Sequence, residues 1–302
     1  MVVTVTLNPA IDKTCKVGKL HKGNVNRMDK VERIAGGKGV NVTKILRQFG
    51  YPVKAIGFLA GTGGKFIEET LLKMGAECDF TYVEGETRVS TNIIEDDGRV
   101  TEILEPGFAV STAQVEEFVA CFGERIKGAS VVVFSGSLPV GVPKDIYKRL
   151  ITVAKEQGCK TFLDTSQEAL REGIESCPYF IKPNLVEMEW YVEKILEDTG
   201  SIAECARALI GRGISKVVIT LGKDGLIAVE KDRFLCKDAY DVAVKNTVGC
   251  GDTVVASYVI SELENEDFVE AVERAGMMAA AAAADETNGQ VCMSTFEKLL
   301  KS

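Results

Sequence analysis

Short apolar and β-branched runs alternate along the chain with segments of helical periodicity. Residues 2–6 alternate as a strand does, and 130–134 form a continuous apolar run typical of a parallel strand covered on both faces. Further strands are predicted at 53–59, 160–163, 179–181 and 216–219, and helices at 42–49, 61–74, 112–127, 143–157, 184–197, 201–212, 253–264 and 267–284. This alternation predicts an α/β fold, a doubly wound and mostly parallel sheet flanked by helices.

Two segments interrupt this alternation with short, polar, β-like stretches that have little apolar surface to bury. They lie at about 13–34 and within 79–105, where Asp96-Asp-Gly98 predicts a turn. We predict that insertions at about 13–34 and 88–105 form a small β-sheet lid that projects from the main body. The sequence has no internal repeat and no low-complexity linker, so a single domain over residues 1–302 is expected.

Composition and charge narrow the range of functions. The net charge of -8 argues against nucleic acid or an anionic membrane surface as the main partner. The apolar run at 275–284 is too short to span a bilayer and is expected to be a buried helix, and the first residues do not resemble a signal peptide. Nine cysteines without a Cys-x-x-Cys pair suit reduced thiols, so a cytoplasmic location is expected. His21 is the only histidine, which leaves a carboxylate as the candidate general base.

The segment Thr247-Val-Gly-Cys-Gly-Asp252 carries the most informative chemistry. Its two glycines allow a tight turn and close approach of a ligand, and the apolar run that follows predicts a helix beginning there. The unpaired amides of a helix N-terminus attract anions, and Asp252 in the same turn supplies a carboxylate. This combination suits phosphoryl transfer. The alternative interpretation is that Asp252 only caps the helix.

A second glycine-rich turn precedes the helix at 42–49. Gly36-Gly-Lys-Gly39 allows a ligand to approach the backbone closely and is followed by Asn41. Lys38 and Asn41 are therefore polar side chains at a helix start that could contact such a ligand. The turn matches neither a Walker loop nor a dinucleotide-binding fingerprint, and its alternative interpretation is a turn with a solvated lysine. Arg88, in the second insertion, is either a solvated edge residue or a bidentate phosphate contact.

Polar or small residues follow several of the predicted strands. The segments concerned are 7–12, 135–139, 164, 182–184 and 220–225, with Glu187 one helical turn beyond the fourth. Because ligands collect at the carboxyl edge of a parallel sheet, these strand ends predict the rim of an active site. Asp12, in the first of these segments, could also be a loop carboxylate that only solvates a turn.

Two of these motifs together resemble the signatures of the ribokinase-like (PfkB) carbohydrate kinases. They are Gly36-Gly-Lys-Gly-Val-Asn-Val42 and Thr247-Val-Gly-Cys-Gly-Asp252, and the resemblance covers essentially the whole chain. The segments 6–12, 135–139, 182–184 and 220–225 are similar to the phosphosugar branch, which contains 1-phosphofructokinase and tagatose-6-phosphate kinase. Cys250 departs from the alanine or serine usual in the family, which a backbone-amide anion hole tolerates.

The resemblance implies a role for each of these residues. Asp252 would be the general base, beside an anion hole formed by the amides of Gly249, Cys250 and Gly251. Sugar-phosphate binding would involve Asp12, Gly37, Lys38, Asn41, Arg88, Arg27 and Ser137, with Lys38, Arg88 and Arg27 near the phosphate already on the sugar. The nucleotide would bind at Asn184, Thr220, Gly222, Gly225, Gly251 and Asn288, and Glu187 with Asn184 would hold Mg2+ through water.

These roles imply an ATP- and Mg2+-dependent kinase that converts fructose 1-phosphate to fructose 1,6-bisphosphate, and a homodimer through the lid. Tagatose 6-phosphate remains an alternative substrate. Asn92 occupies a position where fructose-1-phosphate kinases commonly have lysine, and Gly289-Gln-Val-Cys-Met293 is more similar to the tagatose branch. A non-catalytic phosphosugar sensor is an alternative of another class, although it would need no base at 252. A dehydrogenase is disfavoured because no dinucleotide fingerprint follows the first strand.

Overall fold

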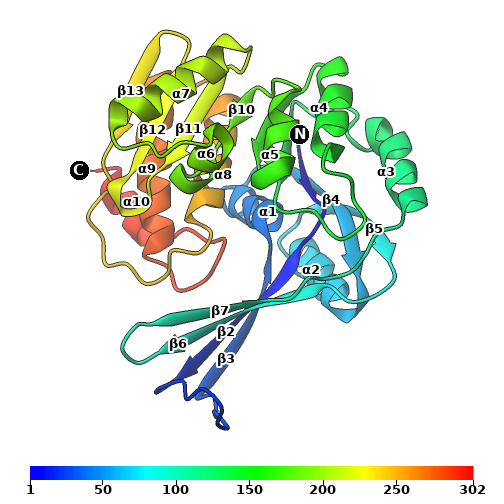
Figure 1. The fold of residues 1–302 in the computed structure, drawn as a ribbon, viewed down its shortest axis with the longest axis vertical. Helices are drawn as coiled ribbons and strands as arrows, with labels where there is room; N and C mark the ends of the chain where they lie inside the picture. Colours follow the sequence, from blue (N-terminus) through cyan, green and yellow to red (C-terminus); the bar gives the residue numbers. More distant parts are fainter. Residues whose placement is uncertain (302) are drawn as a thin grey trace.

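The computed structural model describes residues 1–301 and shows an α/β fold with two sheets (Figure 1). The large sheet has nine strands in the order β13-β12-β11-β10-β9-β8-β1-β4-β5. From β5 to β11 neighbouring strands are parallel, and β12 and β13 are added antiparallel at one edge. The strands are β1 Val2–Thr6, β4 Val53–Ala60, β5 Glu77–Val83, β8 Val131–Ser135, β9 Lys160–Asp164, β10 Phe180–Ile181, β11 Lys216–Thr220, β12 Leu226–Glu230 and β13 Arg233–Lys237. The predicted fold class is confirmed.

Helices cover both faces of this sheet because its strands carry apolar side chains on both. On β8, Val132 and Phe134 belong to one core cluster, whereas Val131 and Val133 belong to another. The first cluster is covered by α3 Thr112–Arg125, α4 Ile146–Glu156, α5 Gln167–Ile174, α6 Leu185–Val192 and α7 Thr199–Gly211. The second is covered by α1 Lys38–Gln48, α8 Cys250–Glu264, α9 Phe268–Ala283 and α10 Met293–Leu299, while α2 Gly61–Lys73 packs beside α1. Burial of both faces accounts for the continuous apolar run in β8.

The two polar insertions pair with each other to form a second sheet of four strands, ordered β3-β2-β6-β7. Its strands are β2 Ala10–Val17, β3 Lys30–Gly36, β6 Arg88–Glu95 and β7 Val100–Leu104. The central pair, β2 and β6, is parallel, and both outer pairs are antiparallel. In Figure 1 this small sheet extends from the end of β1, below the large sheet. It therefore places β2 and β6 at the carboxyl edge, where β1 ends.

Several local predictions were wrong or incomplete. Residues 79–83 belong to β5, which pairs with β4 at the edge of the large sheet, and not to the second insertion. The helix predicted over 184–197 ends at Val192, because Glu193 adopts a left-handed conformation with φ 55°. The short helix α5 and the hairpin of β12 with β13 were not predicted. The helix expected at 267–284 is α9, and within residues 1–301 no helix is long and apolar enough to cross a membrane.

Candidate active site

The loop that precedes α8 forms the floor of the candidate site. Gly249 is the N-cap residue of α8 and has φ 88°. A Cβ on Gly249 would lie 3.1 Å from the Gly289 amide nitrogen, so this position combines a left-handed backbone with close approach of a second loop. The Cys250 amide makes a long contact of 3.4 Å with the Thr247 carbonyl. Because a helix leaves its first amides without partners inside the helix, the turn is suited to bind an anion.

Asp252 lies in this first turn and is almost completely buried, with 6% exposure. Its Oδ2 accepts a hydrogen bond of 2.8 Å from Asn41 Nδ2 on α1, and this partner comes from another helix, unlike the backbone amide of a capping interaction. Burial and the charge of Asp164 raise the pKa of Asp252 to about 7. A carboxylate with this pKa can accept a proton near neutral pH, as a general base must.

Two lysines and Asp164 form a charged cluster next to Asp252. Asp164 ends β9 and is fully buried, and its Oδ1 lies 2.8 Å from Lys38 Nζ and 3.4 Å from Lys182 Nζ. Burial opposes the charge of Asp164, but the two lysines outweigh it and lower its pKa. A Cβ on Gly251 would stand 3.2 Å from Lys182 Nζ, so this ammonium packs against the anion-binding turn. The cluster thus places the Lys182 ammonium against this turn, while Lys38 is paired with the same Asp164 carboxylate.

Lys38 had been assigned to the phosphate of the sugar by resemblance. In the structure its ammonium lies between Asp164 and Glu187, 3.5 Å from Glu187 Oε1. Burial opposes its charge, but the carboxylates of Asp164, Glu187 and Asp252 outweigh this effect and raise the pKa of Lys38. Lys38 therefore remains protonated, and it links Asp164 at the end of β9 with Glu187 in the first turn of α6.

Asp12, assigned to the sugar by the resemblance, lies where the small sheet leaves the end of β1. It lies in β2, is 7% exposed, and its Oδ2 accepts a hydrogen bond of 3.1 Å from Asn288 Nδ2. Burial raises the pKa of Asp12. The nearby Arg88 begins β6 and donates from Nη2 to the Asn8 carbonyl at 3.3 Å, while its buried Nε has no partner among the described residues. An arginine with a free buried donor is well placed to bind an additional anion.

Ser137 lies beside this group. Its Oγ accepts a hydrogen bond of 3.2 Å from Asn8 Nδ2, which places it near the residue whose carbonyl binds Arg88. Ser137 also borders a cavity of about 190 Å³ at the carboxyl ends of β8 and β9. The other residues lining it are Leu138, Lys144, Thr165, Ser166, Gln167, Glu168 and Ala169. Most of these lining residues follow directly after the ends of β8 and β9, and Thr165 is the residue after Asp164.

Four of the six residues assigned to the nucleotide lie at the ends of β10 and β11, whereas Gly251 lies in the first turn of α8. Asn184 and Thr220 form a parallel bridge, and the Thr220 amide donates to the Pro183 carbonyl at 3.1 Å. Asn184 and Glu187 cap α6 reciprocally through two hydrogen bonds of 2.8 Å. Gly222 and Gly225 flank the short turn after β11, with φ 63° and 91°. The structure thus groups these five residues beside the Lys38 cluster.

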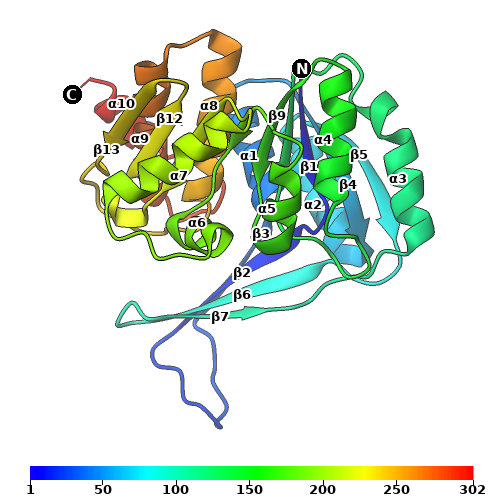
Figure 2. The same cartoon turned by 45° about the horizontal axis from the view of Figure 1, so that its top comes forward.

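Two predicted residues lie apart from their expected neighbours. Asn288 is buried and contacts Asp12 and Asn246, so its side chain lies beside Asp12 and not with the other residues assigned to the nucleotide. Arg27 is exposed on the loop between β2 and β3, and Figure 2 shows this loop projecting away from the body of the molecule. Asn92, which occupies the position of the common lysine, is buried in β6.

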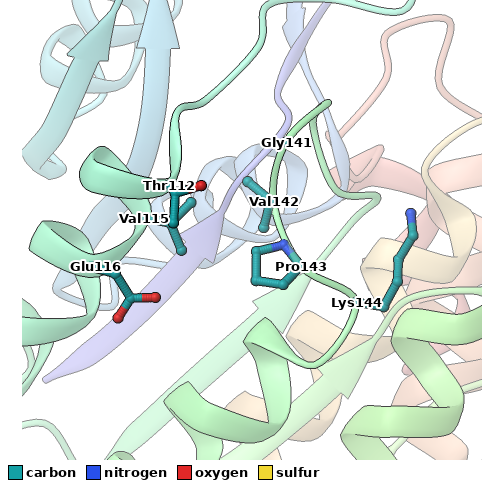
Figure 3. A pocket seen from close by; sticks show the side chains of 7 residues that line it. All are labelled: Thr112, Val115, Glu116, Gly141, Val142, Pro143 and Lys144. Carbon is teal, nitrogen blue, oxygen red and sulfur yellow. The ribbon is translucent and has the colours of Figure 1, made fainter.

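A separate hollow lies between the start of α3 and the loop after β8 (Figure 3). The residues lining it are Thr112, Val115, Glu116, Gly141, Val142, Pro143 and Lys144. None of them belongs to the cluster around Asp252, and the walls are largely apolar. We assign no role in catalysis to this hollow.

Oxygen atoms suited to magnesium are present beside the cluster. Asp164 Oδ2 is buried and has no hydrogen-bond partner among the described residues, and Glu187 places Oε1 near Lys38. Within residues 1–301, no group of three or more metal-binding side chains is arranged to hold an ion by itself. Magnesium commonly binds through one or two carboxylates together with water and substrate phosphates. The residues therefore fit an ion that arrives largely coordinated by a nucleotide.

Asp164, Lys182 and Lys44 were not assigned roles from the sequence. Asp164 and Lys182 stand at predicted strand ends, and this position was the available signal for them. Lys44 follows Asn41 by three residues on α1, so helical spacing places it on the same side of the helix.

Comparisons with known proteins identify the family and the fold of the chain. The family model for pfkB family carbohydrate kinases matches residues 2–295. A Staphylococcus aureus protein provisionally described as a phosphofructokinase shares 29% identity and a TM-score of 0.82, with coverage of 99% of this chain and 96% of the other. A Thermotoga maritima protein described as a possible 1-phosphofructokinase shares 27% identity and a TM-score of 0.90, covering 100% and 97%. Phosphofructokinase-2 from Escherichia coli, at 24% identity and a TM-score of 0.92, covers 99% and 98% and shows the same fold.

Proposed function

Because this chain belongs to the pfkB family of carbohydrate kinases, which are phosphotransferases with an alcohol group as acceptor, we propose that it phosphorylates a ketohexose monophosphate with ATP. The preferred acceptor in this proposal is the 6-hydroxyl of fructose 1-phosphate, and the product is fructose 1,6-bisphosphate. The observation that carries the proposal is the position of Asp252 in the same helical turn as the anion-binding amides, with Lys38 and Lys182 close by.

In this proposal different side chains and backbone amides of the site have different roles in phosphoryl transfer. Asp252 accepts the proton of the attacking hydroxyl, and the amides of Gly249, Cys250 and Gly251 bind oxygens of the moving phosphoryl group. Lys182, packed against Gly251, neutralises charge on the same group. Phosphoryl transfer depends mainly on positioning and electrostatic stabilisation, which fixed buried charges supply.

We assign the nucleotide to the ends of β10 and β11, where Thr220, Gly222 and Gly225 adjoin Asn184. Asn184 and Glu187 would hold Mg2+ through water, and the bound ion would supply neutralisation of phosphate charge. Lys38, between Asp164 and Glu187, would keep this acidic side of the site compatible with an anionic nucleotide.

The acceptor would lie between Asp252 and the small sheet. Asp12, Asn41 and Gly37 surround this space and would bind sugar hydroxyls, while Arg88 and Ser137 would contact the phosphate already present. The free Nε of Arg88 favours a phosphorylated over an unphosphorylated sugar. The Thermotoga maritima relative supports fructose 1-phosphate as the sugar.

Replacing Arg88 by alanine is expected to raise the KM for the sugar phosphate about tenfold or more, because a charge-assisted hydrogen bond to phosphate is lost. The KM for ATP and kcat should change little. Arg99→Ala is the matched control, since Arg99 is an exposed arginine on the turn between β6 and β7. An unchanged sugar-phosphate KM in Arg88→Ala would remove Arg88 from the acceptor site.

Release of ADP across a panel of sugar phosphates tests the function itself. We expect turnover with fructose 1-phosphate to exceed turnover with fructose 6-phosphate and tagatose 6-phosphate. Tagatose 6-phosphate is the second candidate because Asn92, buried in β6, replaces the lysine of fructose-1-phosphate kinases. Thermal stabilisation by a sugar phosphate without release of ADP would instead identify a phosphosugar sensor.

We propose that a second copy of the chain covers the small sheet. Its edge strands expose apolar side chains, among them Val31, Val100, Ile103 and Leu104, which are each about half exposed. Exposed apolar edge strands favour pairing with another chain. Light scattering after gel filtration should give the mass of a dimer for the wild type and of a monomer for Ile103→Lys. Val269→Lys, at an exposed position of α9, is the control, and a monomeric wild type at micromolar concentration would refute the proposal.

A further inference from the structure

Lys44 is a buried lysine on α1 that the proposed mechanism does not use. It is 2% exposed and therefore cannot touch a substrate. Burying an ammonium is costly unless it is paired and hydrogen-bonded. Its surroundings therefore indicate what it does.

The ammonium of Lys44 is hydrogen-bonded to three separate parts of the chain. Nζ donates to the Ala35 carbonyl at 2.9 Å, to Asn41 Oδ1 at 3.2 Å and to the Asn288 carbonyl at 2.5 Å. An ammonium has three N–H donors, so these three acceptors use all of them. Lys44 thereby ties the end of β3, the helix α1 and the loop between α9 and α10 to one another.

The contact with Asn41 sets the direction of the Asn41 amide. Lysine only donates hydrogen bonds, so the carbonyl oxygen of this amide must face Lys44. The amide nitrogen is then left to donate to Asp252 Oδ2, as observed at 2.8 Å. A flipped Asn41 amide would place its oxygen against the Asp252 carboxylate and its NH2 group against the Lys44 ammonium. Lys44 therefore disfavours the flipped orientation, because it has no acceptor for that NH2 group.

The contact with Asn288 positions the opposite side of the site. The Asn288 side-chain amide donates to Asp12 Oδ2 at 3.1 Å, while the Asn288 backbone carbonyl accepts a hydrogen bond from Lys44. The adjoining Gly289 packs directly on this group, because a Cβ there would lie 2.5 Å from Asn41 Oδ1 and 2.8 Å from Lys44 Nζ. Both candidate carboxylates, Asp252 and Asp12, are thus one hydrogen-bonded residue away from the same ammonium.

We propose that Lys44 is a positioning residue that orients Asn41 toward Asp252 and Asn288 toward Asp12, so that base and sugar site are assembled together. Burial lowers the pKa of Lys44 to about 8, and the charges of Asp12 and Asp252 counteract this effect, so the ammonium is largely protonated at pH 7. Its charge also favours the ionised form of Asp252, which Asp164 opposes and Lys38 and Lys182 support. The inference rests on the proposed kinase function.

Lys44→Met, which keeps the length of the side chain and removes its charge and donors, tests the proposal. We expect kcat to fall and the KM for the sugar phosphate to rise, each about tenfold or more, since hydrogen bonds to a charged group are lost. The KM for ATP should stay within about twofold of the wild-type value. The acidic limb of the kcat profile should move to higher pH, because Asp252 loses a nearby positive charge.

The control is Lys216→Met. Lys216 is also buried, but it pairs with Glu262 at the amino end of β11, away from the strand ends that carry the site. This variant should lose stability while its KM values and pH profile remain those of the wild type. A purely structural role for Lys44 predicts the same behaviour for both variants.

The outcomes separate the inference from the function on which it rests. If the wild type releases no ADP with any sugar phosphate, the proposed function fails. If the wild type is active and folded Lys44→Met retains its kcat, sugar-phosphate KM and acidic limb, only the role of Lys44 fails. Should Lys44→Met not fold, the same three quantities are measured on Lys44→Gln, which keeps a donor without the charge. Unchanged values in that variant would equally overturn the proposal.

Discussion

Asp252→Asn is expected to lower kcat by about 10²- to 10⁴-fold, the usual cost of removing a general base. Asparagine keeps the shape of the side chain and can still accept a hydrogen bond from Asn41, so the geometry of the site should persist. It cannot accept the proton of the attacking hydroxyl. ADP release measured at saturating ATP and sugar phosphate checks this expectation, and near wild-type turnover would show that Asp252 is not the base.

The stability of the same variant distinguishes a base from a helix cap. Burial and Asp164 raise the pKa of Asp252 from 3.8 to about 7 in the folded chain. A raised pKa gives stability that is present below the unfolded value and lost as the pH rises through about 7, so the ionised carboxylate destabilises the fold at pH 8. Asp252→Asn should therefore melt no lower than the wild type at pH 8.

Asp267→Ala is the matched comparison, because Asp267 caps α9 through the amides of Val269 and Glu270. It should melt at a lower temperature than the wild type and keep its kinetics. The pH profile of wild-type kcat/KM should fall below about pH 7 as Asp252 becomes protonated. A profile flat down to pH 5 would contradict this assignment.

Lys182→Met is expected to lower kcat by about 10²- to 10³-fold, as the loss of one group that stabilises transition-state charge commonly does. The ammonium packs against Gly251 and is 3% exposed, so no water can readily replace its charge. The KM for the sugar phosphate should change much less than kcat, because the proposed function assigns binding of the acceptor to Arg88 and Asp12. Steady-state kinetics with both substrates measure this difference.

Loss of stability accompanies the same substitution. Asp164 is fully buried, and Lys182→Met leaves it paired with Lys38 alone. Removing one partner of a buried ion pair typically costs about 3–5 kcal/mol when the other charge is left uncompensated, and the loss should be smaller here because Lys38 remains 2.8 Å from Asp164. A second substitution, Asp164→Asn, should recover part of the lost stability without restoring kcat. A folded Lys182→Met variant with wild-type kcat would remove Lys182 from phosphoryl transfer.

The fold and the two glycine-rich turns could be predicted because their signals are local. The continuous apolar run at 130–134 indicates a strand with two buried faces, and the segment 247–252 contains both Asp252, the candidate base, and the glycine-rich turn that begins α8. Polar residues at strand ends indicated where the site lies, since the carboxyl ends of parallel strands meet at one edge.

The remaining contacts of the candidate site join residues far apart in the chain. The periodicity of apolar residues predicts local structure and gives no information on such contacts. Asn41 reaches Asp252 across 211 positions, and Asn288 reaches Asp12 across 276. Lys44 lies in a stretch of α1 whose residues from Gly39 to Leu46 are all buried, and three acceptors from separate parts of the chain satisfy its ammonium there. The parallel pairing of β2 with β6 likewise depends on the return of the chain after α2 and β5.

A crystal structure of the chain with a non-hydrolysable ATP analogue and fructose 1-phosphate would show directly whether Asp252 and the turn that begins α8 contact the same phosphoryl group. We expect the terminal phosphate at the amides of Gly249 to Gly251 and the 6-hydroxyl within about 2.6–3.2 Å of an Asp252 carboxylate oxygen. A nucleotide phosphate and a sugar bound together at any other place on the molecule would refute this assignment.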